Sequence, residues 1–125
     1  MNEIIIKKCP KCGATVEVLH DCTCNNCGIL CCNQPMLTLK PNTTDASFEK
    51  HLPSYEIQGD KILACVNHVM EPEHFIEWIA LQTETQIYKR LLKPGEKAEA
   101  VFPYVEGSKL YSYCNKHALW KKDVD

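Results

Sequence analysis

The sequence lacks a long apolar run, and it lacks an excess of charge of either sign. Its start, MNEIIIKK, has three consecutive isoleucines before two lysines, fewer than the roughly 7–15 apolar residues of a secretion signal. No stretch approaches the roughly 20 apolar residues of a membrane-spanning helix. Lys and Arg number 14 against 16 Asp and Glu, so no basic surface is predicted for nucleic acid or an anionic membrane. We therefore expect a cytoplasmic protein that binds neither nucleic acid nor membranes.

Cysteine, in contrast, is abundant, with nine residues in a chain of 125. In the reducing cytoplasm, so many cysteines indicate metal or redox chemistry rather than disulfides, and the odd count would leave one thiol unpaired. Residues 1–37 are too few to bury an adequate apolar core, so we predict a metal-stapled module at 1–37 and a second domain at 38–125. The first segment holds seven cysteines: Cys9, Cys12, Cys22, Cys24, Cys27, Cys31 and Cys32.

The second domain is predicted to be mostly β. Short segments rich in β-branched and aromatic residues are separated by Gly, Pro or Asp, which is typical of a small antiparallel sandwich. In HFIEWIAL, alternation predicts that Ile76 and Trp78 share one face and that Ile79 lies on the other. A helix is the alternative for this stretch, although its residue types favour a strand. The predicted strands contain YEI, KILACV, HFIEWIAL, QIYKRLL, AVFPYV and KLYSYC.

Four histidines and one cysteine of the second domain fall in three clusters, EKHLP, NHVMEPEH and YCNKHALW. Imidazole and thiolate are preferred ligands of iron, copper and zinc. Two residues separate Cys114 from His117, which lets a turn present both to one ion, and the Met and Pro between His68 and His74 suit a tight loop. Each histidine alone is more simply a surface or core residue. With His51, however, the set has five ligands, too many for tetrahedral zinc and one short of octahedral iron, which predicts an open, reactive position.

Motifs along nearly the whole chain resemble those of the desulfoferrodoxin family, superoxide reductases with an amino-terminal desulforedoxin-like module. They are, in order, CPKCG, CCNQPM, PNTTDASFEKHLP, NHVMEPEHFIEWIAL, LKPG and YCNKHALW. The resemblance implies an immunoglobulin-like antiparallel β-sandwich with a mononuclear non-haem iron. That iron would reduce superoxide to hydrogen peroxide by one electron, without dismutation. Its ligands would be four equatorial imidazoles and an axial thiolate: His51, His68, His74, His117 and Cys114.

Glu49 and Lys50 directly precede the first of these histidines. A cation beside an open metal position raises the local concentration of a small anion. Without the resemblance, a solvated ion pair is the simpler interpretation. The resemblance implies that Lys50 attracts superoxide and helps to supply protons, and that Glu49 can occupy the sixth position of the ferric resting state.

For the first module, the resemblance implies a tetrahedral four-thiolate site that holds iron or zinc. Its ligands would be Cys9, Cys12, Cys31 and Cys32. The insertion DCTCNNCG departs from the family pattern, and CPKCG followed by CNNCG is typical of a zinc ribbon or rubredoxin. Cys24 and Cys27 therefore compete with the adjacent pair as ligands. A second ion or thiol redox chemistry, with Cys22 unassigned, is a further alternative.

We predict an enzyme, a superoxide reductase, and two other functions compete with it. A rubredoxin-like electron-transfer protein or a structural zinc protein would use the cysteine module and would not need the histidine set. A thiol oxidoreductase using CPKC would need a βαβ pattern, which the sequence lacks. The resemblance also implies rubredoxin as electron donor and a homodimer. Trp78 and Trp120 lie near ligand residues in the sequence, and we interpret them as packing residues.

Overall fold

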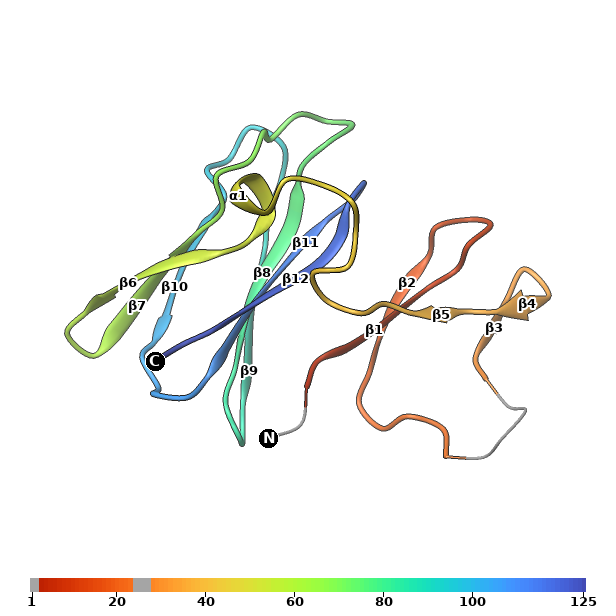
Figure 1. Ribbon diagram of the computed structural model, residues 1–125, viewed down its shortest axis with the longest axis horizontal. Helices are drawn as coiled ribbons and strands as arrows, with labels where there is room; N and C mark the ends of the chain where they lie inside the picture. Colours follow the sequence, from red (N-terminus) through yellow and green to blue (C-terminus); the bar gives the residue numbers. More distant parts are fainter. Residues whose placement is uncertain (1–2, 24–27) are drawn as a thin grey trace. The chain divides into compact units, whose positions relative to one another are not determined.

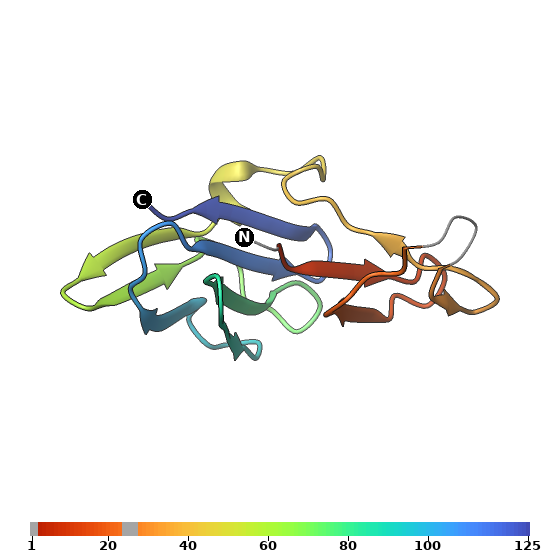
Figure 2. The ribbon, with the colours of Figure 1, turned by 90° about the horizontal axis from the view of Figure 1, so that it is seen from below.

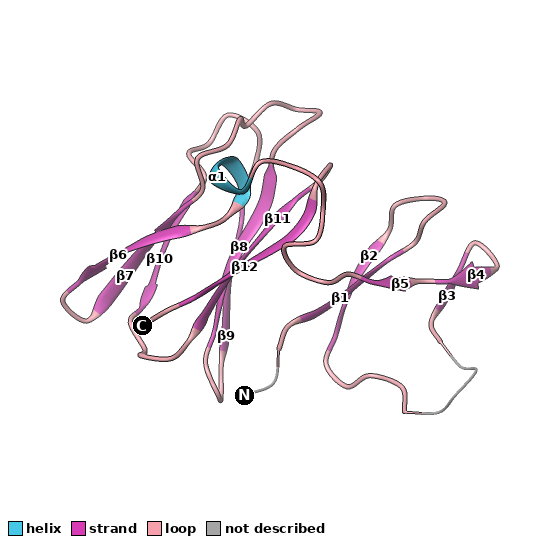
Figure 3. Cartoon of the chain, in the orientation of Figure 1, coloured by secondary structure: helices cyan, strands magenta, loops and turns pink. Residues whose placement is uncertain are grey.

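The computed structural model describes residues 3–23 and 28–125. The chain forms two compact units, one ending at Lys40 and the other spanning 41–125. Figure 3 shows that strands dominate both units, and in the part that the structure describes the one helix is α1 (Phe48–His51). No helix within the described ranges has the length and apolar character to cross a bilayer.

The first unit is built from five short strands. A three-stranded antiparallel sheet has the order β2-β1-β5, and β3 pairs separately with β4. Few of the side chains in this unit are buried, and among the described ones the apolar examples are Ile4, Ile6, Cys9 and Met36. So small an apolar core agrees with the expectation that a metal stabilises the unit. The strands are β1 (Ile5–Lys8), β2 (Thr15–Val18), β3 (Leu30–Cys31), β4 (Gln34–Pro35) and β5 (Leu37–Thr38).

The second unit is a two-layer sandwich of antiparallel sheets, and its strands can be followed in Figures 1 and 2. One sheet has the order β10-β7-β6 and the other the order β12-β11-β8-β9. The predicted mostly-β fold, with a cysteine module followed by an antiparallel sandwich, is therefore confirmed. The strands are β6 (Ser54–Gln58), β7 (Lys61–Cys65), β8 (Ile76–Gln82), β9 (Ile87–Leu91), β10 (Glu99–Pro103), β11 (Lys109–Cys114) and β12 (Ala118–Asp123).

Alternating apolar residues of the facing sheets form the core. On β7, Ile62 and Ala64 are fully buried while Lys61 at the start of the strand is exposed, as the period of two requires. The turn between β6 and β7 includes Gly59 at φ +68°, a conformation that residues with a Cβ rarely adopt. The core also takes in Leu81 of β8 and Leu110 of β11.

The predicted faces of β8 are wrong at one point. Tyr113 pairs with Trp78, but the next residue of β11, Cys114, pairs with Ile76. Glu77 is thus an extra residue in β8, a β-bulge, and it returns Ile76 to the core face that Ile79 occupies. A helix for this stretch is excluded, because residues 76–82 form a strand. The bulge lies opposite Cys114, one of the candidate ligands.

Candidate metal centres

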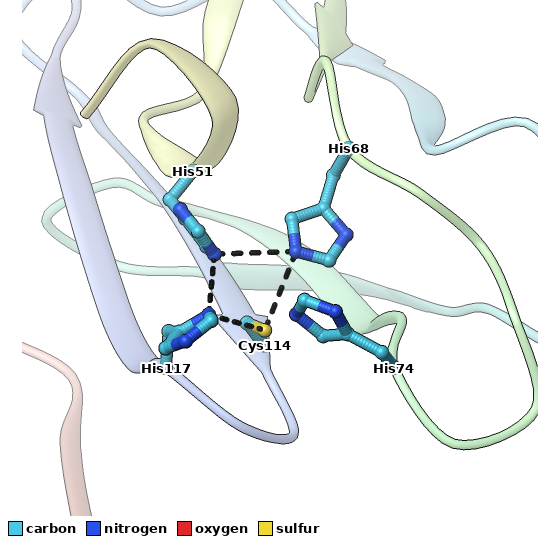
Figure 4. Close-up of side chains that lie close together, drawn as sticks. All are labelled: His51, His68, His74, Cys114 and His117. Carbon is cyan, nitrogen blue, oxygen red and sulfur yellow. Dashed lines mark hydrogen bonds between the residues drawn. The ribbon is translucent and has the colours of Figure 1, made fainter. Parts of the chain in front are cut away.

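Five side chains of the second unit converge at one end of the sandwich (Figure 4). His51 ends α1, His68 and His74 come from the loop between β7 and β8, Cys114 ends β11, and His117 lies in the turn before β12. One possible ligand atom from each of these residues lies within 4.8 Å of those of the others. Three separate segments of the chain, at 51, 68–74 and 114–117, therefore supply the donors.

The separations between these donor atoms match those of ligands around a metal. His51 Nε2 lies 2.9 Å from His117 Nδ1 and 3.2 Å from His68 Nε2. Two nitrogens at right angles around an ion, each about 2.1 Å from it, would be about 3.0 Å apart. Cys114 Sγ lies 3.5 Å from His68 Nε2 and 3.8 Å from His117 Nδ1, which suits the longer metal–sulfur bond.

The hydrogen bonds of two histidines orient one ring nitrogen of each toward the other. The Nδ1–H of His51 donates to the Ser47 carbonyl at 2.7 Å, and that of His68 donates to the Val69 carbonyl. Burial lowers the pKa of His51 and of His68, which favours the neutral form of both rings. Each Nε2 then presents a lone pair to the other, and two acceptors cannot form a hydrogen bond. A metal ion would accept both lone pairs, while the Nδ1–H bonds hold the rings.

A cation at the same place would also suit His74 and Cys114. His74 Nε2 is buried without a hydrogen-bond partner among the described residues, and burial lowers the pKa of this ring. Burial raises the pKa of the Cys114 thiol, against backbone hydrogen bonds from Lys116 and His117 that lower it. A bound cation would supply the missing partner of the imidazole and favour the thiolate.

Asn115 fixes the loop that carries His74, a role that sequence reasoning missed. Its side-chain amide donates to the Glu73 carbonyl at 3.0 Å, and its Oδ1 accepts the Phe75 amide at 3.0 Å. The residues on both sides of His74 are thus held. The spacing within YCNKH placed Asn115 between two ligands, but nothing in the sequence indicated its partners. In the same hairpin Ala118 has φ +64°, an uncommon conformation of the kind that clusters at functional sites.

Glu49 and Lys50 lie on the exposed side of α1, immediately before the buried His51. The converging group within the described residues does not include the Glu49 carboxylate. The charge of Lys50 affects one of the candidate ligands, His68. After burial, which has the largest effect, the charges of His74, His117 and Lys50 further lower the pKa of His68.

The second converging group lies in the first unit and consists of cysteines. Cys12 Sγ is 3.6 Å from Cys31 Sγ, which is 4.0 Å from Cys32 Sγ. Sulfurs in a tetrahedron about 2.3 Å from an ion would be about 3.8 Å apart. Cys32 and Asn33 have φ of 54° and 63°, a left-handed turn at which adjacent cysteines join one group. The full group is Cys9, Cys12, Cys31 and Cys32, whose sulfurs lie within 4.8 Å of one another.

The pKa values of two of these thiols shift in opposite directions. The Cys12 backbone amide, whose N lies 3.4 Å from Cys9 Sγ, has the largest effect in lowering the pKa of Cys9 to about 6. Contact with the Cys12 side chain has the largest effect in raising the pKa of Cys31 to about 12. Ionisation of one thiol thus disfavours ionisation of its neighbour, and a bound cation would relieve the repulsion between the thiolates. The group therefore fits a four-thiolate metal site.

The alternative ligands Cys24 and Cys27 lie outside the described residues. Cys22 is described, is exposed and does not belong to the converging group. Its backbone amide donates to Asp21 Oδ1 at 2.8 Å. The seven described cysteines are all free thiols, so no disulfide competes for Cys9, Cys12, Cys31 or Cys32.

The donor sets described above lie in a chain whose second unit matches a known family. The family model described as Desulfoferrodoxin matches residues 43–123. The chain belongs to the desulfoferrodoxin family. A desulfoferrodoxin of Syntrophotalea carbinolica is 43% identical over 127 residues, covering 98% of each chain. Members of this family bind iron.

Two further comparisons, one of sequence and one of structure, extend this result. A superoxide reductase of Thermococcus kodakarensis is 32% identical over 112 residues, which cover 71% of this chain and 97% of that protein. The crystal structure of the superoxide reductase from Treponema pallidum superposes with a TM-score of 0.73 at 24% identity, covering 97% of this chain and 99% of the other. The structural comparison shows a fold shared along nearly the whole chain.

Proposed function

We propose that the second unit is a superoxide reductase, an oxidoreductase that reduces superoxide by one electron at a non-haem iron. The observation that carries the proposal is the set of five converging donor atoms, in which two imidazole lone pairs face each other at 3.2 Å. A five-donor set leaves one octahedral position open, which a purely structural site would not need. The similarity to the Thermococcus kodakarensis protein named superoxide reductase supports the same activity.

The protein groups have distinct roles in this proposal. The ligands would be His51, His68, His74, His117 and Cys114. Iron held there would supply the single electron that superoxide accepts. Neutral imidazoles add no negative charge to the centre, so an anion is still attracted to it. The Cys114 thiolate would donate electron density to the metal, as a cysteine ligand does in some haem enzymes.

Glu49 and Lys50 act from the exposed side of α1. Lys50 raises the local concentration of superoxide and assists the supply of protons through water. We assign to Glu49 the part of a carboxylate that covers the centre in its resting state. Each superoxide takes up one electron and two protons and leaves as one hydrogen peroxide molecule. An electron donor must therefore restore the centre after each turnover, and a small redox protein such as rubredoxin fits this requirement.

For the first unit we propose a four-thiolate centre of iron or zinc at Cys9, Cys12, Cys31 and Cys32. Its four sulfurs fill a tetrahedron, which leaves no position for substrate, so the centre would stabilise the unit or carry electrons. A reducing compartment such as the cytoplasm would keep these ligands as thiols.

The stoichiometry of the reaction tests the proposal. With iron-loaded protein and an excess of reductant, we expect one hydrogen peroxide per superoxide consumed and no dioxygen released. Dismutation would instead yield one peroxide and one dioxygen for every two superoxide ions. Superoxide consumption no faster than in buffer with reductant would contradict the proposal, and release of dioxygen would assign dismutase activity.

A further inference from the structure

Trp120 on β12 contacts two of the five donor residues. Its indole stacks on the His51 ring, with centroids 5.0 Å apart and planes inclined by 22°. Its Nε1–H donates to the His117 carbonyl at 3.0 Å. Trp120 itself is fully buried within the sandwich. One rigid side chain therefore links a ligand at the end of α1 with a ligand 66 residues further along the chain.

Two hydrogen bonds hold His51 at an edge of its ring and at its backbone, and Trp120 contacts a face of the ring. The Ser47 carbonyl accepts the Nδ1–H at 2.7 Å, and the buried Ser112 hydroxyl donates to the His51 carbonyl at 3.0 Å. These bonds fix one edge of the ring and the backbone. Stacking on the indole opposes rotation of the ring out of the plane that these bonds define. Phe48 packs edge-on against the same indole, with centroids 5.1 Å apart and planes at 87°.

We propose that Trp120 is a positioning residue of the histidine–cysteine centre. It holds the His51 ring and the His117 backbone together, so that Nε2 of the first and Nδ1 of the second remain 2.9 Å apart before metal enters. Because the indole is buried in the sandwich, the ligand side chains are already ordered, and they lose less conformational entropy when the ion binds. The inference rests on the proposed metal centre.

Trp78 provides a matched control. It lies in the same sheet and is also buried, but it stacks on Tyr113, with centroids 5.8 Å apart and planes inclined by 12°. The ammonium of Lys89 covers its ring at 4.3 Å. Substitution of either tryptophan by leucine removes a large buried ring from one sheet. The ring contacts of Trp120 include a ligand imidazole, whereas those described for Trp78 do not.

The test compares Trp120→Leu and Trp120→Phe with Trp78→Leu and Trp78→Phe in the full-length, iron-loaded protein. The readouts are the rate of iron loss to a chelator, the cysteine-to-ferric absorption band and the melting temperature of the metal-free protein. For Trp120→Leu we expect iron loss to be about 10–100-fold faster, with a shifted band, as for other residues that orient ligands. Trp120→Phe should lie between Trp120→Leu and the unaltered protein, since it keeps a stacking face but loses the N–H donor.

The Trp78 variants should lower the melting temperature similarly and leave iron loss within about threefold and the band unchanged. Equal iron loss in Trp120 and Trp78 variants of matched melting temperature would overturn the inference. If Trp120→Leu does not fold, Trp120→Phe against Trp78→Phe decides by the same criterion. No readout depends on superoxide turnover. If Cys114→Ser leaves the cysteine-to-ferric absorption band unchanged, the proposed metal centre is refuted. If the protein binds iron normally but does not reduce superoxide, only the proposed function is refuted.

Discussion

The two units build their donor sets in opposite ways. In the first unit, the four cysteines come from two short segments, 9–12 and 31–32, and Cys12 and Cys32 are exposed. In the second, five donors come from three segments, and His51 and Cys114 are buried against a continuous core. A metal can therefore replace the core in one unit, while in the other the core orders the ligands. In the function that we propose, four thiolates stabilise the first unit, whereas four imidazoles and one thiolate carry the chemistry of the second.

Metal removal should give the largest difference in stability between the two units. When a chelator strips the full-length protein, we expect the first unit to unfold and the second to keep its sandwich. Metal binding at structural thiolate sites contributes about 10–16 kcal/mol to folding, far more than so small an apolar core can supply. Amide hydrogen exchange should lose protection over 5–18 and retain it over 61–65. Protection that persists over 5–18 without metal would show that the first unit folds on its own core.

Serine substitution of one cysteine ligand should disrupt one metal centre and leave the other intact. Cys114→Ser should slow superoxide consumption by more than about 100-fold, because ligand loss exceeds the effect of losing a residue that orients one. The first unit should remain metallated. Cys9→Ser should empty the four-cysteine site and change superoxide consumption by less than about twofold when a chemical reductant is supplied. Metal content and superoxide decay check both variants, and unchanged consumption in Cys114→Ser refutes the site assignment.

Removal of one exposed charge should test whether the second centre attracts its substrate. For Lys50→Ala, we expect the bimolecular rate with superoxide to fall about tenfold at low ionic strength and to depend less on salt. Lys61→Ala, at the opposite end of β7 from the loop with His68, is the control and should react at the normal rate. Pulse radiolysis at several salt concentrations measures both. Equal rates in the two variants would show that the charge of Lys50 does not attract superoxide to the centre.

Acid should destabilise the metal-free second unit. Burial lowers the pKa of His51, His68 and His74 from 6.5, so the unfolded chain binds protons that the folded chain does not. The free energy of unfolding should therefore fall as the pH drops below 6.5. Thermal melts of metal-free protein at pH 7.5 and 5.5 measure this effect, and iron loading at pH 7.5 should raise the melting temperature. An unchanged melting temperature at the lower pH would contradict buried neutral imidazoles.

The smallest effect concerns a buried polar atom that belongs to no donor set. Gln82 Oε1, like His74 Nε2, is buried without a partner among the described residues, but it lies at the other end of β8. Gln82→Met should raise the free energy of unfolding by about 1 kcal/mol, because it removes an unpaired carbonyl. Denaturant titration measures the change, and iron content should be normal. Destabilisation by Gln82→Met would mean that the amide makes contacts worth more than its burial costs.

Much of the second unit could be predicted from short-range pattern. Apolar alternation and turn residues predicted six of its strands, since a strand with one face in the core repeats every two residues. The same pattern failed at Glu77, because a bulge depends on the partner strand and has no signature in HFIEWIAL itself. The final strand, Ala118–Asp123, was not predicted as a strand, and its place beside β11 follows from the pairing of Cys114 with Ala118.

By itself, the sequence determined the types of donor and their local spacing. Spacing along the chain limits which side chains one turn can present to an ion. The relevant spacings are those of CPKC, of the adjacent Cys31 and Cys32, and of Cys114 and His117, which two residues separate. Tertiary structure decided which atoms face one another. The tautomer of His51 depends on the Ser47 carbonyl, and the orientation of its ring depends on Trp120, far away in the chain. Such contacts arise only when the sheets pack, because hydrogen bonding and stacking depend on positions in space rather than on separation along the chain.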